Sequence, residues 1–252
     1  DCYIHQGKDS YDGIVFYNVT NGVIEKNIIT ENRNGVMFRT QENGKENSEY
    51  NIIRNNSITN NSNDGIHFEH TGYGYHNNNT IAHNILLNNS KGIYLIMSEY
   101  NLIVSNNIIS NNEVGVMLDM CEGGGEFNRI HHNNFVNNVV KQAYELGGPI
   151  NTWDHGYPSG GNYWSDYTGE DNDGDGIGDT PYEIPEGINE DRYPLMDPWG
   201  GLNLPPNKPS INGPISGKPG VEYDYSFVTH DPDDDDVKYV IDWYTTGEFI
   251  ET

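Results

Sequence analysis

The sequence of 252 residues predicts an all-β protein: a right-handed, single-stranded parallel β-helix with a C-terminal cap, followed by a partial immunoglobulin-like β-sandwich. Three observations predict this architecture. A short phrase rich in asparagine returns five times, a glycine and an alternating strand accompany the copies, and the composition changes near residues 147 and 204. We therefore expect three segments, at residues 1–146, 147–203 and 204–252.

The repeated phrase has the form Ile-x-x-Asn-x-apolar-x-x-Asn, and its two asparagines are five residues apart in every copy. An asparagine at a turn tolerates left-handed backbone angles, and asparagines stacked in successive coils can continue a ladder of amide hydrogen bonds. We expect two such columns, with a structural rather than a ligand-binding role. Their members are Asn27, Asn56, Asn84, Asn106 and Asn133 in one column, and Asn32, Asn61, Asn89, Asn111 and Asn138 in the other.

A short strand follows the glycine of each repeat. The first and third residues after the glycine are apolar, as in Ile66 and Phe68 after Gly65, and this period of two is typical of a strand with one buried face. The glycines are 22, 30, 27 and 23 residues apart, which indicates a coil that accepts insertions at one place. Such a repeat predicts a parallel β-helix whose coils stack about 4.8 Å apart and wind to the right by the general crossover rule.

Composition excludes some classes of protein. With 38 acidic and 13 basic residues the net charge is −25, which disfavours a nucleic-acid partner. No apolar run is long enough to predict a membrane span. The chain begins at Asp1 inside a coil and its last module is short, so we expect that the sequence is a piece of a longer protein.

An aspartate-rich loop follows the repeats. Asp171, Asp173 and Asp175 alternate before Gly176, and Asp179 comes four residues after Asp175. Carboxylates at this spacing around a glycine turn are typical of calcium loops, in which the backbone carbonyl of Ile177 can be a further ligand. We expect a structural calcium ion there, and the alternative is a solvated Asp-Gly turn. Nearby Trp and Tyr residues provide the apolar area that a cap needs.

The segment around this loop resembles a known family. The runs GGNYWSDYTGEDNDGDGIGDTPY (residues 160–182) and DRYPLMDP (residues 191–198) are similar to the C-terminal end of NosD-type parallel β-helix proteins. That family includes a periplasmic copper-protein maturation factor and many surface proteins. With the repeats, the resemblance covers residues 1 to about 200, and it implies the fold more directly than the function.

The last segment begins with a proline-rich linker. Two alternating runs, at residues 221–229 and 237–243, predict half-buried strands. The run DPDDDDVKYVIDW (residues 231–243) resembles PKD and related immunoglobulin-like modules. A complete sandwich of this type needs about 100 residues, so we expect a truncated module.

The NosD resemblance directs attention to copper ligands. Met37 and His67 are the second residues after their glycines, so they face outward one coil apart. A thioether and an imidazole suit copper. A column of Met and His side chains on a sheet is more often packing.

A second alternative is a polysaccharide-modifying enzyme of the glycoside hydrolase, lyase or epimerase type. The fourth residues after their glycines include Glu69 and Asp119, two coils and so about 9.6 Å apart. That separation is near the range of an inverting glycosidase pair. These two carboxylates are the candidate catalytic residues.

Aromatic residues on the outward side and in the inserted loops suggest glycan binding. Rings that stack on sugars, with amides beside them, are common in such sites. The candidate substrate-binding residues are Tyr73, Tyr75, Tyr94 and Tyr100.

We therefore expect a non-catalytic, calcium-stabilised β-helix protein that acts outside the cytoplasm, at the cell surface, in the extracellular space or in the periplasm. The expected role is adhesion, scaffolding or binding to a polysaccharide or cell-surface glycan. The polysaccharide-modifying enzyme and the copper-binding maturation factor are the alternatives.

Overall fold

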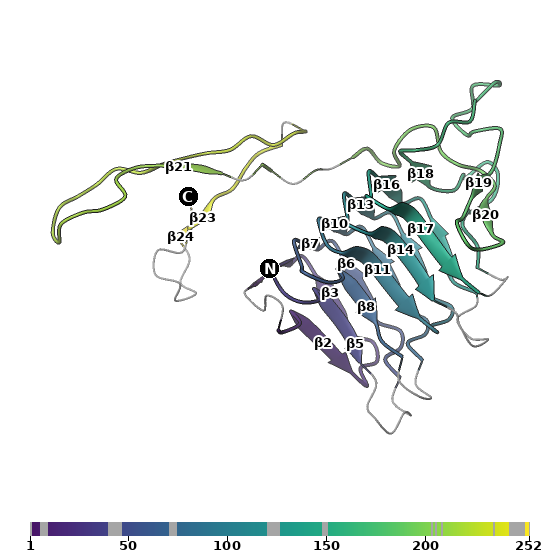
Figure 1. Ribbon diagram of the computed structural model, residues 1–252, viewed down its shortest axis with the longest axis horizontal. Coiled ribbons are helices and arrows are strands. Elements are labelled where there is room, and N and C mark those ends of the chain that lie inside the picture. Colours follow the sequence, from purple (N-terminus) through teal and green to yellow (C-terminus); the bar gives the residue numbers. More distant parts are fainter. Residues whose placement is uncertain are drawn as a thin grey trace. The chain divides into compact units, whose positions relative to one another are not determined.

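A computed structural model gives the fold (Figure 1). The described residues are 2–5, 10–39, 47–70, 75–119, 127–147, 151–202, 204, 206–207, 209–233, 235–241 and 250–251. They form strands and turns without a helix, so no helix among them could cross a membrane. The chain divides into two compact units, Asp1–Leu202 and Asn203–Thr252.

The first unit is a parallel β-solenoid with three sheets, and each coil adds one strand to each sheet. Sheet 1 contains β1 (Tyr3–Ile4), β4 (Ile28–Thr30), β7 (Ser57–Thr59), β10 (Ile85–Leu87), β13 (Asn107–Ile109), β16 (Asn134–Val136) and β18 (Tyr163–Trp164). Sheet 2 contains β2 (Ile14–Tyr17), β5 (Val36–Arg39), β8 (Ile66–Phe68), β11 (Lys91–Ile96), β14 (Val114–Asp119) and β17 (Lys141–Leu146). Sheet 3 contains β3 (Val23–Glu25), β6 (Ile52–Arg54), β9 (Thr80–Ala82), β12 (Leu102–Val104) and β15 (Arg129–His131).

The core is a set of vertical columns of apolar side chains. In sheet 3, Ile53 pairs with Ile81 and Ile81 lies below Ile103 in strict register, and all three are fully buried. In sheet 2, Phe38 and Phe68 stack with ring centroids 4.1 Å apart. Burying one such side chain stabilises the fold by about 1.5–3 kcal/mol relative to exposing it, so stacked coils supply the energy that one coil lacks.

Two residues turn the corner between sheets 3 and 1. The first adopts a left-handed backbone, as Asn55 does with φ 54°, and the second is the column asparagine, as in Asn56. The buried amide of Asn84 shows the bonding: its backbone N–H and its Nδ2 donate to Asn106 Oδ1 at 2.9 and 3.0 Å. Both predicted sets of asparagines make this contact from coil to coil, so each column is a continuous ladder.

A third ladder lies at the other end of the sheet 3 strands. It runs through Asn51, Asn79, Asn101, Asn128 and Asn151, with the same backbone and side-chain donors. The sequence analysis did not find this column. Its signal was present in the sequence, because each of its first four members lies five residues before the asparagine of the first column in the same coil.

The glycine column is a close-approach device. A Cβ built on Gly65 would lie 2.6 Å from the carbonyl oxygen of Gly92 and 2.9 Å from Leu86 Cδ2. Only glycine fits where the backbone of the next coil comes this near.

Residues 151–202 continue beyond the repeats. Trp164 on β18 is buried between Phe135 and Tyr182, with ring centroids at 4.2 and 4.1 Å. β19 (Tyr182–Glu183) and β20 (Glu190–Asp191) form a small antiparallel pair beside it. Trp164 therefore lies on the last aromatic residue of the solenoid core, while the predicted cap role stays a prediction.

The second unit differs from the expected immunoglobulin-like sandwich, which is not confirmed. Its described residues form two separate antiparallel pairs: β21 (Ser210–Asn212) with β22 (Ser226–Val228), and β23 (Val240–Ile241) with β24 (Ile250–Glu251). β21 falls inside the segment interpreted as linker, and the predicted run at 221–229 is a strand only over Ser226–Val228. Residues 242 and 243 lie outside the described residues.

Candidate metal centre

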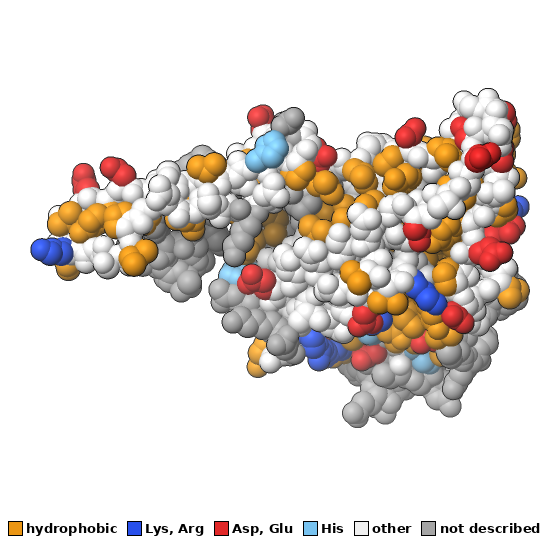
Figure 2. All heavy atoms as spheres, turned by 45° about the horizontal axis from the view of Figure 1, so that its top comes forward, with side chains coloured by type: hydrophobic (Ala, Val, Ile, Leu, Met, Phe, Trp, Pro, Cys, Tyr) orange, Lys and Arg blue, Asp and Glu red, His pale blue; other side chains and the backbone are white. Residues whose placement is uncertain are grey.

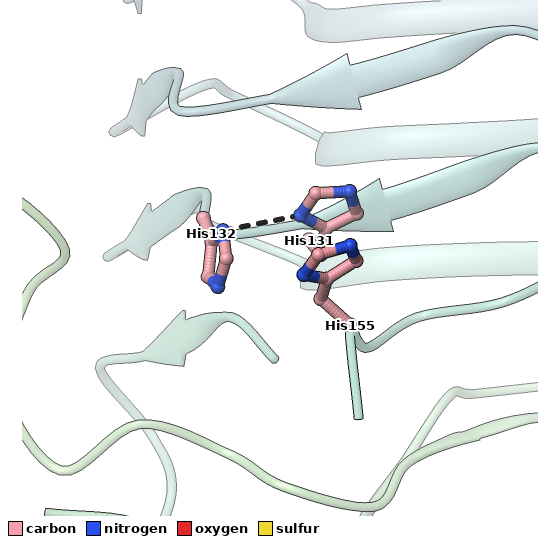
Figure 3. A group of neighbouring side chains, drawn as sticks. All are labelled: His131, His132 and His155. Carbon is pink, nitrogen blue, oxygen red and sulfur yellow. Dashed lines mark hydrogen bonds between the residues drawn. The ribbon is translucent and has the colours of Figure 1, made fainter. Parts of the chain in front are cut away.

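Three histidines meet on the outside of the solenoid where sheet 3 ends (Figure 3). His131 is the last residue of β15, and His132 occupies the left-handed corner after it, with φ 58°. His155 comes 23 residues after His132, which is close to the length of one coil. Sheet 3 continues past β15 through a parallel bridge between Arg129 and Thr152, and this bridge carries His155 to the other two rings.

The ring nitrogens converge. One nitrogen from each histidine lies within 4.8 Å of the others, and the Nδ1 atoms of His131 and His132 are 3.2 Å apart. The rings of His131 and His155 are stacked with centroids 4.6 Å apart. His131 and His132 are buried, while His155 is exposed, so the cluster has one open side.

Hydrogen bonds fix which nitrogens are free. The carbonyl oxygen of Ser159 can only accept, so His132 Nε2, at 2.9 Å, donates to it. A neutral His132 therefore presents an unprotonated Nδ1 to His131. The Ser159 hydroxyl lies 3.0 Å from His155 Nδ1, which leaves Nε2 of that ring for another partner. One serine thus orients two of the three rings.

The cluster favours uncharged rings. Burial lowers the pKa of His131 to about 4, with further lowering from His132, His155 and Arg129. Burial also lowers the pKa of His132. Neutral imidazole is the form that binds a metal ion, so neither ring has to lose a positive charge near neutral pH. Without an ion, His131 Nδ1 donates to His132 Nδ1 at 3.2 Å, and binding of an ion at His131 Nδ1 would move that proton to Nε2 of the same ring.

An indole closes one side of the cluster. Trp199 stacks on His132 with centroids 3.7 Å apart and an interplanar angle of 8°. Asn134 on β16 holds this tryptophan in place, since its Oδ1 accepts from Trp199 N at 2.7 Å and its Nδ2 donates to Trp199 O at 3.1 Å. The indole covers a face of His132 that water would otherwise contact.

These residues fit a metal ion. Two nitrogens bound to one ion at about 2.0–2.1 Å are themselves about 2.9–3.4 Å apart for the usual coordination angles, and the Nδ1 pair falls in that range. Imidazole ligands suit copper, zinc, iron and nickel. His131, His132 and His155 would hold the ion.

The sequence model of the family described as "Periplasmic copper-binding protein (NosD)" matches residues 4–169. The chain belongs to the NosD family. A probable ABC transporter binding protein NosD from Stutzerimonas stutzeri is 36% identical over 107 residues, covering 39% of this chain and 23% of the relative. Its namesake from Pseudomonas aeruginosa is 41% identical over 88 residues, covering 35% of this chain and 19% of the relative. The chain thus spans about a fifth of the length of each, and no solved structure matches it significantly.

The NosD match includes the two residues interpreted as copper ligands. Met37 and His67 are neighbours in register on β5 and β8. His67 Nδ1 lies 2.7 Å from the buried carboxylate of Asp64, so this contact uses Nδ1 and not Nε2. Met37 is 3% exposed and its sulfur accepts from Asn34 Nδ2 at 3.8 Å.

The candidate catalytic carboxylates lie in different coils, at the ends of β8 and β14 of sheet 2. Asp119 ends β14 and its Oδ2 accepts from the Tyr94 hydroxyl at 3.0 Å. Glu69 follows β8, and Ile96, the register partner of Asp119, lies on the strand between them. The enzymatic interpretation gains no further residue from this arrangement and stays a prediction.

The candidate glycan-binding tyrosines have different neighbours. Tyr75 stacks on His70 at 5.4 Å, Tyr94 bonds to Asp119, and Tyr100 stacks on Phe127 at 5.0 Å. Tyr73 lies outside the described residues. Because Tyr100 and Phe127 are parallel, each covers a ring face that a sugar would use.

The aspartate loop brings its first three carboxylates together, with oxygens of Asp171, Asp173 and Asp175 within 4.8 Å of one another. Repulsion from Asp175 raises the pKa of Asp173. Asp179 Oδ2 instead accepts from Asn172 N and Nδ2 at 2.8 and 2.7 Å, while the backbone N–H of Ile177 donates to Asp175 at 2.9 Å. Calcium binding stays a prediction.

Sequence reasoning missed the three histidines. The signal available was the adjacent pair at 131 and 132, placed at a coil corner, with a third histidine one coil later.

Proposed function

We propose that this NosD-family protein binds copper outside the cytoplasm, at the centre formed by His131, His132 and His155. The convergence of three imidazole nitrogens, two of them 3.2 Å apart, carries the proposal. The family description supports copper among the metals that imidazole suits, and it also supports a periplasmic location.

Copper bound there would supply a Lewis-acidic and redox-active ion, and the chain's own residues do the rest. His131 and His132 provide buried, neutral nitrogens. Ser159 orients His132 and His155, and an oriented ligand loses less freedom on binding. Trp199 excludes water from one side, while exposed His155 marks the side through which an ion enters and leaves.

Copper titration against a competing chelator tests the proposal. His132→Asn removes a ligand but keeps a residue that tolerates the left-handed corner. His83 offers a matched control, because it is exposed and occupies the same corner two coils earlier, with φ 54°. We expect the three-histidine centre to bind one copper tightly in the wild-type protein and in His83→Asn, and at least tenfold more weakly in His132→Asn, whatever the Met37 and His67 pair adds to the total. Equal affinity in all three proteins would contradict the proposal.

The pair of Met37 and His67 is a second proposed copper site. Its support is the carboxylate–imidazole contact with Asp64, which orients His67 as such contacts orient metal ligands. His67→Ala in the same titration separates the two sites: loss of a second copper equivalent supports this pair, and an unchanged stoichiometry removes it.

A further inference from the structure

A buried carboxylate lies beside the three-histidine centre. Asp154 directly precedes His155. Thr152 is the bridge partner of Arg129, so Asp154 and His131, each two residues further along, occupy equivalent positions in successive coils. The side chain of Asp154 is 1% exposed. Its carboxylate is not among the converging ligand atoms, but its charge acts on His131. A free carboxylate in this place would therefore be a counter-charge for any cation on the histidines.

Arg192 forms a two-point ion pair with that carboxylate. Its Nη2 donates to Asp154 Oδ1 and its Nε to Oδ2, both at 2.8 Å. The backbone N–H groups of Gly156 and Arg192 donate to the same two oxygens at 2.9 and 3.3 Å. A carboxylate has about four acceptor positions, so these four donors leave Asp154 none for a metal.

The groups around the centre supply no net negative charge. Imidazoles that bind a metal ion do so as neutral ligands, Asp154 is neutralised by Arg192, and Arg129 adds a positive charge that lowers the pKa of His131. The solvation energy that an ion loses on burial rises with the square of its charge, so a divalent ion needs anionic compensation far more than a monovalent one. An all-nitrogen set without a negative charge is better matched to a single positive charge.

We propose that Arg192, by engaging both carboxylate oxygens of Asp154, withholds a negative charge from the three-histidine centre and so sets its preference for Cu(I) over Cu(II) and other divalent ions. This inference rests on the proposed copper function. Arg192 acts as a specificity-determining residue that touches the carboxylate rather than the metal.

Two substitutions with opposite expected signs test the inference. Arg192→Gln leaves Asp154 negative, so the ratio of Cu(I) to Cu(II) affinity falls. Asp154→Asn leaves Arg192 positive, so the same ratio rises. A unit charge within several ångströms at an effective dielectric constant of about 20 changes affinity by roughly tenfold or more. A tenfold change corresponds to about 59 mV in the one-electron Cu(II)/Cu(I) potential, downward for the first variant and upward for the second.

The readouts are chelator competition with Cu(I) under anaerobic reducing conditions, the same with Cu(II) and Zn(II) in air, and the midpoint potential. Arg33→Gln is the matched control, because Arg33 makes a similar two-point contact with buried Asp12 in the first coils, through Nε at 2.9 Å and Nη2 at 2.7 Å. We expect the control to keep the wild-type ratio.

The outcomes separate the two proposals. An unchanged ratio in both variants, or shifts of the same sign, overturns the role of Arg192 while the copper site stands. No copper of either oxidation state bound by the wild-type protein overturns the site and this inference together.

Discussion

The asparagine ladders predict that alanine substitutions at two neighbouring residues of one coil, Asn111 and Asn112, differ greatly in their cost to stability. Asn111 is fully buried, and its Oδ1 accepts from Asn89 N at 3.0 Å. Asn111→Ala leaves that N–H buried without its acceptor and deprives the Leu86 carbonyl of the Nδ2 donor at 3.1 Å. One orphaned buried donor costs about 1–3 kcal/mol, and with the lost side-chain bonds we expect a destabilisation of about 2–4 kcal/mol.

Asn112→Ala is the control, because Asn112 is exposed and its bond to Asn89 O uses only the backbone. We expect a change of no more than about 0.5 kcal/mol there. The assays are urea unfolding and hydrogen exchange at the Asn89 amide, which reads the orphaned group directly even if the coils unfold separately. Equal unfolding midpoints for the two variants, with unchanged exchange at Asn89, would refute the ladder as a source of stability.

Three further predictions concern other parts of the first unit. Burial lowers the pKa of His76 to about 4 from an ordinary value of 6.5, so the unfolded chain binds more protons between these pH values. The free energy of unfolding should therefore fall by up to roughly 3 kcal/mol as the pH drops from 6.5 toward 4. His76→Gln should flatten that slope, measured by urea unfolding at several pH values. Gly65→Ala should destabilise by about 1–3 kcal/mol or more because the added Cβ meets the Gly92 carbonyl, whereas Gly174→Ala, where a Cβ meets nothing but the backbone is left-handed, should cost about 1 kcal/mol in the same assay. Calcium should raise the thermal unfolding midpoint of the wild-type protein but not of Asp173→Asn, and a midpoint indifferent to calcium would leave the loop a plain turn.

The solenoid could be predicted because its physics repeats. A three-residue strand and a two-residue corner make a side of five residues, and the corner requires a left-handed residue followed by an amide that bonds to the next coil. The same asparagine spacing therefore recurs in the sequence of each coil, as in Asn79, Asn84 and Asn89 of one coil. The glycine column can be predicted from the sequence in the same way, since the close approach at Gly65 recurs from coil to coil.

The candidate metal centre could be predicted only in part. The histidines at 132 and 155 are one coil apart, which periodicity can detect. Their convergence also depends on Ser159, Trp199 and Arg192, which lie on an irregular path after the repeats. No period places such residues, because their positions follow from individual tertiary contacts. The immunoglobulin-like expectation is not confirmed, for a related reason: alternation at residues 221–229 predicts a strand but not its partner.

The surface is consistent with the composition that guided these interpretations. Figure 2 shows acidic side chains outnumbering basic ones on the face in view, in line with the net charge of −25. A strongly negative surface raises the local concentration of cations, which favours encounter with a metal ion without specifying where it binds.

The direction of the ladders explains how Arg192 comes to lie beside the candidate metal centre. In each column the amide donors point toward the next coil, so the end of a column needs an acceptor. Gln142 Oε1 is the acceptor at the end of the second column, at 2.8 Å from the last asparagine. The first column continues to Asn162 and ends at a carboxylate. Asp191 is that acceptor for the first column: its Oδ2 accepts from Asn162 N at 2.7 Å and from Trp164 Nε1 at 2.9 Å, and burial raises its pKa to about 7 although these donors act in the opposite direction.

Glu145 ends the third column in the same way, accepting from Asn151 Nδ2 at 2.7 Å and Trp153 Nε1 at 3.0 Å. The residues that end the ladders are thus fixed by buried hydrogen bonds, and Arg192 directly follows Asp191. An arginine anchored in this manner can hold Asp154 at a defined place beside His131 without help from the surface loops. The polar columns that stabilise the solenoid therefore also position the charge that we infer governs its metal.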